Sequence, residues 1–548
     1  MALKSISSSY ISNRTTHLMS LDCGSSDLTY TDDNNIVWTG DDSFIGNGES
    51  EVVANTNNVS HVMSTLRVFT SRKKNCYSIP ADQGNKVLVR ASFYYGNYDK
   101  KSSPPTFDLL FDGNLWATVV TSIDQVIYYE VIYVVKGDAI SVCVAQTMPN
   151  QYPFMSALEV RGIESDMYKY VDSNYALFSR RRVAYGANDT IRYSDDPYDR
   201  IWSPAIVSNG LIAVPGTDPT FIDNTGSANL PPPAVLANAV TTTSTSTSIL
   251  IGTNLPTTPV PIYISMYFSE VTQLDSTQTR SFELYIDNKA NSDPIIPPYD
   301  GVIELVTYNT TATSNTSFSL VATSSSTLPP IINALEVYAV SESPLTDGTN
   351  NKDVNGLSAL QTAFSVLKEW SGDPCLPAPY TWDWVNCSSD ATPRVTALYG
   401  LSSYLPDFSS MDALQTIDMH NNSIVGSIPD FLGTLPNLRQ LNLANNELSG
   451  TIPTSISKNN NLKLTISGNP NLCTSTSSKS CGATTTTSTT SSSSGSPSGG
   501  AKTSKLPVIL GVTIPVFVLF WALVGLMVIL QQRRKRASLM AIGTGKFI

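Results

Sequence analysis

Three pairs of adjacent carboxylates come closest to a catalytic arrangement in this sequence: Asp32/Asp33, Asp41/Asp42 and Asp195/Asp196. Glycoside hydrolases use two carboxylates, which flank the scissile bond from different sides of the sugar. Adjacent side chains on a strand or a turn generally diverge, so these pairs do not match that geometry. We interpret them as turn and cap residues.

No motif in the sequence supports phosphoryl transfer. A protein kinase needs a Gly-rich loop, a strand lysine, His-Arg-Asp and Asp-Phe-Gly, and this set does not occur. Residues 543–546 match part of a phosphate-binding loop, but the first glycine at the required spacing and the following Ser or Thr are missing. The sequence therefore predicts no enzymatic activity and no cofactor for this chain.

Seven cysteines and three histidines occur without a Cys-x-x-Cys pair, so no metal site is predicted. Two pairs that are close in sequence are predicted to form disulfides in an exported chain: Cys375/Cys387 and Cys473/Cys481. Three cysteines remain: Cys23, Cys76 and Cys143. One of them is expected to be free or to pair outside the chain, and the spacing does not say which.

The composition argues against a nucleic-acid partner. The net charge is −11 and the isoelectric point is near 4.8, whereas phosphate binding requires a basic face. A length of 548 residues is suited to two to four domains.

An apolar run at 506–530 contains no charged residue or amide and is long enough to span a bilayer as one helix. The basic cluster at 533–536 that follows predicts a cytoplasmic C-terminal end. We therefore expect a single-pass type I protein of the plasma membrane, with a flexible Ser/Thr-rich stalk at 483–505 and a cytoplasmic tail at 531–548. Residues 1–20 lack the apolar run of a signal peptide, so we expect an upstream segment to be missing.

The first 340 residues contain an internal repeat. The segment VLVRASFYYG at 87–96 matches IYISMYFSEV at 262–271 and places Phe93 opposite Phe268. The matches FDLLFDG with FELYIDN and ALEV at 157–160 with ALEV at 334–337 follow in the same order, which indicates two copies of one domain. Both ALEV segments carry a glutamate, Glu159 and Glu336, which we interpret as a strand-end carboxylate bound to backbone rather than a ligand contact.

Each copy consists of short blocks rich in Val, Ile, Tyr and Phe, separated by Gly, Asn, Asp and Pro. This pattern predicts a mostly β fold with two tandem β-sandwich lobes of jelly-roll type, at 21–170 and 171–342.

Long, ordered motifs run through both copies. They include LDCG at 21–24, LRVFTSRKKNCY at 66–77, RYSDDPYDRIW at 192–202, PPPAVLANAV at 231–240 and LPPIINALEVY at 328–338. From about Leu21 to Tyr338 the sequence resembles the malectin-like ectodomain of plant leucine-rich-repeat receptor kinases. The resemblance implies an extracellular recognition module.

An amphipathic helix is predicted after residue 353, because apolar residues recur at three- and four-residue intervals: Leu357, Leu360, Phe364 and Leu367. The following segment, 370–387, resembles the N-terminal cap of plant leucine-rich repeats, including the Gly-Asp-Pro-Cys element at 372–375. Its three tryptophans are interpreted as cap packing rather than as a sugar platform: Trp370, Trp382 and Trp384. Helix and cap together are assigned to 343–392.

Leucine-rich repeats are predicted at 393–482 as a short solenoid of about three to four repeats. The pattern from Leu414 to Pro429 recurs from Leu438 to Pro453. The concave strand positions are expected to be Thr416, Asp418, His420, Gln440, Asn442 and Ala444. A partner contact and a solvated polar face both remain open for them.

Candidate ligand contacts come from the resemblance. Animal malectin stacks aromatic rings on glucose oligosaccharides, and the positions that look like its aromatic strand are Tyr94, Tyr95, Tyr98, Tyr267, Phe268 and Glu270. For the tyrosines, packing is favoured over contact with a glycan or a protein. N-glycosylation sequons, which fit an exported surface, occur at Asn13, Asn58, Asn188, Asn309, Asn315, Asn386 and Asn421.

Three functional hypotheses follow. The first is a cell-surface receptor-like protein that recognises an extracellular glycan, peptide or protein and signals through a partner kinase acting as co-receptor. The second is an incomplete version of a receptor Ser/Thr kinase. The third is a cell-wall adhesion protein that binds glycans without signalling.

Overall fold

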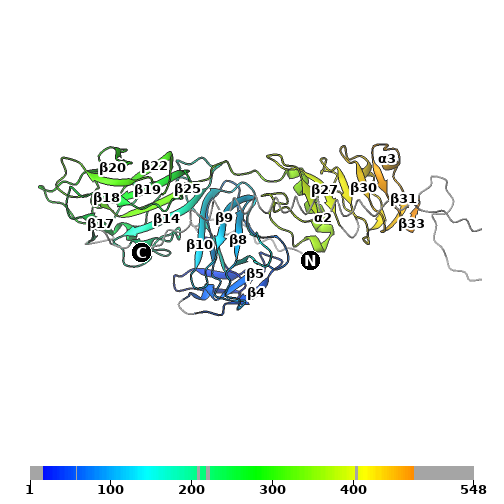
Figure 1. Cartoon of the computed structure of the whole chain (residues 1–548), viewed down its shortest axis with the longest axis horizontal. Helices are drawn as coiled ribbons and strands as arrows, with labels where there is room; N and C mark the ends of the chain where they lie inside the picture. The colour runs from blue at the N-terminus through cyan, green and yellow to red at the C-terminus, as the bar shows by residue number, and fades with distance from the viewer. Residues whose placement is uncertain (1–16, 57–58, 206–209, 217–221, 401–404, 474–548) are drawn as a thin grey trace, which may run out of the picture. The chain divides into compact units, whose positions relative to one another are not determined.

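The computed structural model describes residues 17–56, 59–205, 210–216, 222–400 and 405–473 (Figure 1). All of them belong to the first of two compact units, residues 1–481 and 482–548. Within the described ranges, no helix is both long and apolar enough to cross a membrane. The predicted stalk, the apolar run at 506–530 and the tail lie outside these ranges.

The described residues of the first lobe form thirteen strands. Alternating buried positions along them, such as Val87, Val89, Ala91 and Phe93, join residues of two facing sheets into one core. The strands are β1 (His17–Asp22), β2 (Thr29–Thr31), β3 (Val37–Gly40), β4 (Glu49–Val52), β5 (Thr65–Val68), β6 (Lys74–Pro80), β7 (Lys86–Phe93), β8 (Thr106–Phe111), β9 (Asn114–Val120), β10 (Ile127–Val134), β11 (Ala139–Gln146), β12 (Phe154–Met155) and β13 (Ala157–Gly162), with a 3-10 turn η1 (His61–Met63).

Among its described residues, the second lobe contains strands β14 to β25 and one short α-helix. They are β14 (Leu177–Tyr185), β15 (Ser203–Ala205), β16 (Leu211–Pro215), α1 (Pro233–Leu236), β17 (Asn238–Thr242), β18 (Ile249–Ile251), β19 (Val260–Phe268), β20 (Phe282–Ile286), β21 (Lys289–Ala290), β22 (Ile303–Ala312), β23 (Phe318–Ala322), β24 (Ile331–Ile332) and β25 (Ala334–Val340). The expected mostly β fold is confirmed.

The two lobes repeat the same core contact. Phe93 packs edge-on against Phe107 with ring centroids 5.5 Å apart, and Phe268 packs edge-on against Phe282 at 5.2 Å. Strand order repeats as well, since β13-β7-β10 in the first lobe corresponds to β25-β19-β22 in the second. The internal repeat inferred from the sequence is therefore a structural repeat.

One sheet runs through both lobes, in the order β2-β3-β1-β13-β7-β10-β14-β25-β19-β22. The lobes join where β10 pairs antiparallel with β14, through Val131 opposite Phe178 and Ile132 opposite Leu177 (Figure 1). Each lobe thus covers an edge strand of the other, which leaves fewer unpaired backbone groups at the seam.

Parallel strands of the repeat solenoid form two ladders. The first consists of β26 (Val385–Cys387), which pairs antiparallel at its end, followed by β27 (Val395–Tyr399), β28 (Thr416–Asp418), β30 (Gln440–Asn442) and β32 (Lys463–Thr465). The second contains β29 (Val425–Ser427), β31 (Glu447–Thr451) and β33 (Asn471–Cys473), and short turns η4 (Asp430–Gly433) and α3 (Thr454–Ser457) lie between strands. Asn446 Nδ2 donates to the carbonyl oxygens of Met419 and Leu443, so the repeated asparagine satisfies backbone groups at the bend.

The predicted amphipathic helix is shorter than its apolar pattern. Helix α2 (Asn351–Ala363) buries Leu357 and Leu360, but Phe364 is extended (φ −114°, ψ 103°), and η3 (Ser365–Leu367) follows. Phe364 and Leu367 are still buried in the solenoid core, together with Trp382 and Trp384. Packing against the cap, not helical geometry, places the last two apolar residues.

The disulfides show which of Cys23, Cys76 and Cys143 is free. Cys375 bonds to Cys387 as predicted, and Cys76 bonds to Cys143 across the β6–β11 pair. Cys23 is free and buried. Cys473 is disulfide-bonded, and Cys481 lies outside the described residues.

Candidate functional site

The aromatic residues proposed from the malectin resemblance are mostly buried. Tyr94, Tyr95, Tyr267 and Phe268 are fully enclosed, and Tyr98 is half-buried with its ring edge-on to Tyr95. The Tyr94 hydroxyl donates to the Asn55 carbonyl oxygen at 3.0 Å, and the Tyr267 hydroxyl donates to Glu336 at 2.6 Å. Packing, the favoured alternative, describes their positions, and they do not form an exposed sugar platform.

Glu270 is also enclosed, and its Oε1 accepts a hydrogen bond from Arg280 Nε at 2.5 Å. The position is therefore an internal ion pair in the second lobe rather than an exposed ligand contact.

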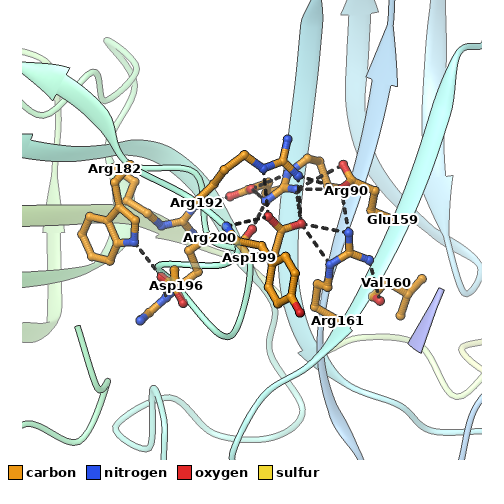
Figure 2. Close-up of polar contacts among 12 residues, drawn as sticks. Arg90, Glu159, Val160, Arg161, Arg182, Arg192, Asp196, Asp199 and Arg200 are labelled. Atoms are coloured by element: carbon orange, nitrogen blue, oxygen red, sulfur yellow. Dashed lines mark hydrogen bonds and ion pairs between the residues drawn. The ribbon is translucent and has the colours of Figure 1, made fainter. Parts of the chain in front are cut away.

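Ten charged side chains, nine of them buried, lie at the seam between the lobes, and we call them the inter-lobe ion cluster; Figure 2 labels most of them. Five are arginines and five are carboxylates: Arg90, Arg161, Arg182, Arg192 and Arg200, with Glu130, Glu159, Asp196, Asp199 and Glu336. Only Arg192 is noticeably exposed, at 21% of its side chain. The formal charges balance, which is what burial of so many ionised groups requires.

Glu130 on β10 links the two lobes directly. One of its oxygens accepts from Arg90 of the first lobe at 2.7 Å, and the other accepts from Arg182 of the second lobe at 2.6 Å. Arg182 continues to Glu336 at 2.8 Å. Burial raises the pKa of Glu130, but Arg182 and Arg90 outweigh it and hold the pKa below its ordinary value.

Asp199 anchors the segment that carries RYSDDPYDRIW. Its carboxylate accepts from Arg161 at 2.8 Å and from Arg192 at 2.9 Å, as Figure 2 shows. Nearby, Asp196 accepts from the Arg200 guanidinium at 2.8 Å and from the Trp202 indole at 2.7 Å. The Asp195/Asp196 turn is therefore more than a turn, because Asp196 is a buried ion-pair partner.

The prediction for the repeated glutamates needs correction. Glu159 binds Arg90, Arg161 and Arg192, and Glu336 binds Arg182 and the hydroxyl of Tyr338. Their partners are side chains, not backbone groups. Both glutamates remain structural, because each fixes charged groups in the seam rather than facing solvent.

The Gly-Asp-Pro-Cys element docks on the first lobe. Lys74 Nζ donates to the carbonyl oxygens of Asp373 and Leu376 at 2.6 and 2.8 Å. The Tyr380 hydroxyl donates to Asp108 at 2.7 Å. These contacts join two strands of the first lobe, β6 and β8, to the cap that follows the second lobe in sequence.

Gly372 lies directly on the Cys76–Cys143 disulfide. A Cβ at this position would stand 2.4 Å from Cys76 Sγ, and the backbone has φ of +75°. Asp373 then fixes the turn, because its carboxylate accepts from Thr349 and from the backbone of Cys375. We call these contacts and those of Lys74 and Tyr380 the lobe–cap joint.

A cavity of about 970 Å³ opens beside the lobe–cap joint. Three parts of the chain line it: the turns at 80–85 and 136–141 of the first lobe, the connector at 346–354, and the cap at 372–374. The lining has no aromatic side chain and contains one lysine against five aspartates, namely Asp82, Asp112, Asp138, Asp347 and Asp373. Lys136 is already engaged, since its Nζ lies 2.6 Å from Asp347. The cavity is therefore negatively charged.

The predicted concave residues of the repeats share one face. Thr416, Asp418, Gln440 and Asn442 are half-buried on neighbouring strands, with the fully buried Ile417 and Leu441 between them. His420 is exposed and contacts Asp418 at 2.6 Å, whereas Ala444 is nearly enclosed. These side chains form a polar patch on neighbouring strands of the repeats.

All described sequon asparagines are exposed: Asn188, Asn309, Asn315, Asn386 and Asn421. Asn13 and Asn58 lie outside the described residues.

Two family models match the chain. The malectin-like domain matches residues 21–340, and a leucine-rich-repeat model of two copies matches residues 412–457. An uncharacterized Arabidopsis thaliana protein is 37% identical over 337 residues, which cover 61% of this chain and 66% of the relative. A probable LRR receptor-like serine/threonine-protein kinase of Arabidopsis thaliana is 35% identical, over 72% of this chain and 48% of the relative.

The fold also matches solved structures. The crystal structure of the ANX2 ectodomain from Arabidopsis thaliana superposes with a TM-score of 0.51 at 17% identity, over 59% of this chain and 96% of that ectodomain. The chain spans about half the length of the curated receptor-kinase relatives it matches. Its relatives include plant leucine-rich-repeat receptor-like kinases, and the chain belongs to the malectin-like domain family.

Proposed function

We propose that this chain is the extracellular recognition part of a plasma-membrane receptor, anchored as a type I protein by the apolar run at 506–530. The malectin-like and repeat architecture supports it, as do relatives named receptor-like kinases. The kinase activity of such a receptor would come from a partner, or from a longer version of this chain. Ligand binding on the ectodomain would change how that kinase is engaged.

The observation that carries the proposal is the cavity at the lobe–cap joint. Its volume of about 970 Å³ lies at the upper end of the roughly 300–1,000 Å³ typical of ligand sites. Its walls come from segments far apart in sequence that the joint holds together. A ligand bound there would contact the first lobe, the connector and the cap at once.

The chemistry of the lining selects among the ligand classes. Stacking of sugar rings needs exposed aromatic faces, and the lining has none. Its negative charge instead attracts lysine or arginine side chains. We therefore propose a peptide or protein ligand with a basic segment.

The proposal is tested with the secreted ectodomain and a library of synthetic peptides that carry two or more basic residues. The double variant Asp82→Asn/Asp138→Asn removes two lining charges, and Asp390→Asn, an exposed cap position outside the lining, is the control. We expect the cavity variant to weaken binding at least about tenfold. Equal binding by all three proteins contradicts the proposed site.

A partner kinase has its own test. The full chain is expressed in plant cells with an enzyme that biotinylates nearby proteins fused after Ile548. Enrichment of a receptor kinase on addition of a binding peptide supports signalling through a partner. Kinase activity encoded downstream of Ile548 in the full-length transcript supports the longer-chain alternative instead.

A further inference from the structure

A second cavity, of about 430 Å³, lies on the outer edge of the second lobe. The turn at 170–175, which connects the lobes, forms one side of it. The start of β19, the end of β25 and residues 308–311 of β22 form the rest. Two exposed tyrosines form its aromatic wall. Tyr170 and Tyr308 stack with ring centroids 4.7 Å apart and planes 18° apart, and they remain 43% and 39% exposed.

A bulge in β22 creates this wall. Ile262 pairs with Thr310 and Ile264 pairs with Thr307, so that Tyr308 and Asn309 together face the single residue Tyr263. Asn309 has φ of +55°, a left-handed conformation that asparagine tolerates better than most residues. The bulge leaves both Tyr308 and Asn309 exposed on a strand that ends the long sheet.

The sequon Asn309-Thr310-Thr311 is itself part of the lining. All three residues are exposed, so the Asn309 amide is accessible on the surface beside the stacked rings. The remaining lining adds groups that bind sugar hydroxyls, among them Asp172, Ser341 and Glu342. An aromatic wall with a few polar groups is the general composition of a carbohydrate site.

We propose that an N-glycan on Asn309 folds back into this cavity and covers the Tyr170–Tyr308 pair. In the attachment step, Asn309 Nδ2 bonds to the anomeric carbon of the first N-acetylglucosamine of a lipid pyrophosphate oligosaccharide. The bond from that carbon to the pyrophosphate oxygen breaks with its electron pair on the oxygen, the lipid pyrophosphate leaves, and the proton lost by the amide passes to solvent. The first sugars then pack on the tyrosines and tie β22 to the inter-lobe turn.

The proposal rests on the extracellular location proposed above. The sequon at Asn315 is an internal control that distinguishes failure of the glycan proposal from failure of the proposed location. Asn315 is an exposed sequon in the turn after β22 and does not line the cavity. Sugars held in the cavity are hidden from the trimming enzymes of the secretory pathway. We expect mannose-rich glycans at Asn309 and trimmed, extended glycans at Asn315.

The protein is expressed in plant leaf cells from its full-length transcript, which includes any segment upstream of Met1, and glycopeptides of both sites are measured by mass spectrometry. Thr311→Ala removes the sequon and Thr311→Ser preserves it, so this pair isolates the glycan from the substitution. We expect hydrogen exchange at 166–176 to be at least about threefold faster in Thr311→Ala than in Thr311→Ser. In a Tyr170→Ala/Tyr308→Ala background, that difference disappears and the Asn309 glycans are trimmed like those on Asn315.

Two results overturn the proposal while leaving the extracellular location intact. One is an occupied Asn315 with an unmodified Asn309, and the other is identical trimming at both sites in the wild-type chain. Absence of glycans from both sites overturns the glycan proposal and the extracellular location together.

Discussion

Buried ion pairs between single side chains connect the two lobes. Glu130 stands between Arg90 and Arg182, which belong to different lobes, and all three side chains are enclosed. A buried ion pair adds little over apolar packing of the same volume, but removing one partner leaves an uncompensated charge. Separating the lobes would leave these charges buried without a partner, so the cluster opposes any change in how the two lobes pack together.

Glu130→Gln tests this at a single residue. The amide cannot neutralise two guanidinium groups, so we expect the free energy of unfolding of the ectodomain to fall by about 3–5 kcal/mol. Glu164→Gln is the control, because Glu164 is exposed and surface changes usually stay within about 0.5 kcal/mol. Urea unfolding measures both, and a loss below about 1 kcal/mol in Glu130→Gln would contradict the role of the cluster.

Titration of buried carboxylates predicts a pH optimum of stability on the acid side of neutrality. Burial raises the pKa of Asp22 and Asp112 from 3.8 to about 6, so the folded state binds these protons more tightly than the unfolded state. Their contribution is full below about pH 4 and is lost as the pH rises through 6. Asp199 acts in the opposite direction: burial is outweighed by Arg90 and Arg161, which hold its pKa well below the ordinary value.

We expect the free energy of unfolding to rise by about 1 kcal/mol per raised carboxyl from pH 7 to pH 5. It should fall again below about pH 4, because Asp199 and Glu130 take up protons in the unfolded state while the folded state still holds them charged. Asp112→Asn should remove its share of the rise. Unfolding curves at pH 7, 5 and 3 measure the profile. A stability that decreases steadily from pH 7 to pH 5 would contradict the assignment.

At the level of elements, strands and repeats could be predicted because their signals are local. The period of two in VLVRASF and the recurring leucines of the repeats need only neighbouring residues, and both became β7, β28 and β30. The ion cluster could not be predicted in the same way. Arg90, Glu130 and Asp199 come from separate segments, and only the pairing of β7 with β10 and the docked loop brings them together.

The candidate site was missed for a related reason. The aromatic strand positions had the residue types of a sugar site, but alternation in a sheet turned them into the core. The Gly-Asp-Pro-Cys element was predicted as part of a repeat cap that contains a disulfide, and its docking on the Cys76–Cys143 bond depends on a contact between distant segments. The dense charges of RYSDDPYDRIW were the one sequence signal of a buried network.

Gly372→Ala tests the lobe–cap joint. The new methyl group would meet Cys76 Sγ at 2.4 Å, and the positive φ adds strain. Gly84→Ala is a matched control, because Gly84 also has a positive φ (+89°) but nothing lies within 4 Å of its Cβ. Backbone strain should lower the free energy of unfolding of both variants by roughly 1 kcal/mol.

The contact should lower the free energy of unfolding of Gly372→Ala by roughly a further 1–3 kcal/mol. This loss of stability should be confined to the lobe–cap joint. We expect faster hydrogen exchange at 343–376 in Gly372→Ala but not in Gly84→Ala. Equal behaviour of the two variants would show that the glycine is needed for its conformation alone and that the joint is not tightly packed.

At the scale of the whole molecule, two joints connect the candidate ligand surfaces. The shared sheet and the ion cluster join the lobes, and the lobe–cap joint connects the first lobe to the repeats. The acidic cavity at the second joint and the polar face of the repeats are the two candidate ligand surfaces. Of these two surfaces, we propose that the acidic cavity binds the basic peptide.

Hydrogen exchange of the ectodomain with and without a basic peptide selected from the library tests that claim most directly. We expect protection of the cavity lining at 80–85, 136–141, 346–354 and 372–374, and we expect the Asp82→Asn/Asp138→Asn variant to lose this protection. Protection confined to the repeat strands at 416–418 and 440–442, and unchanged in that variant, would contradict it.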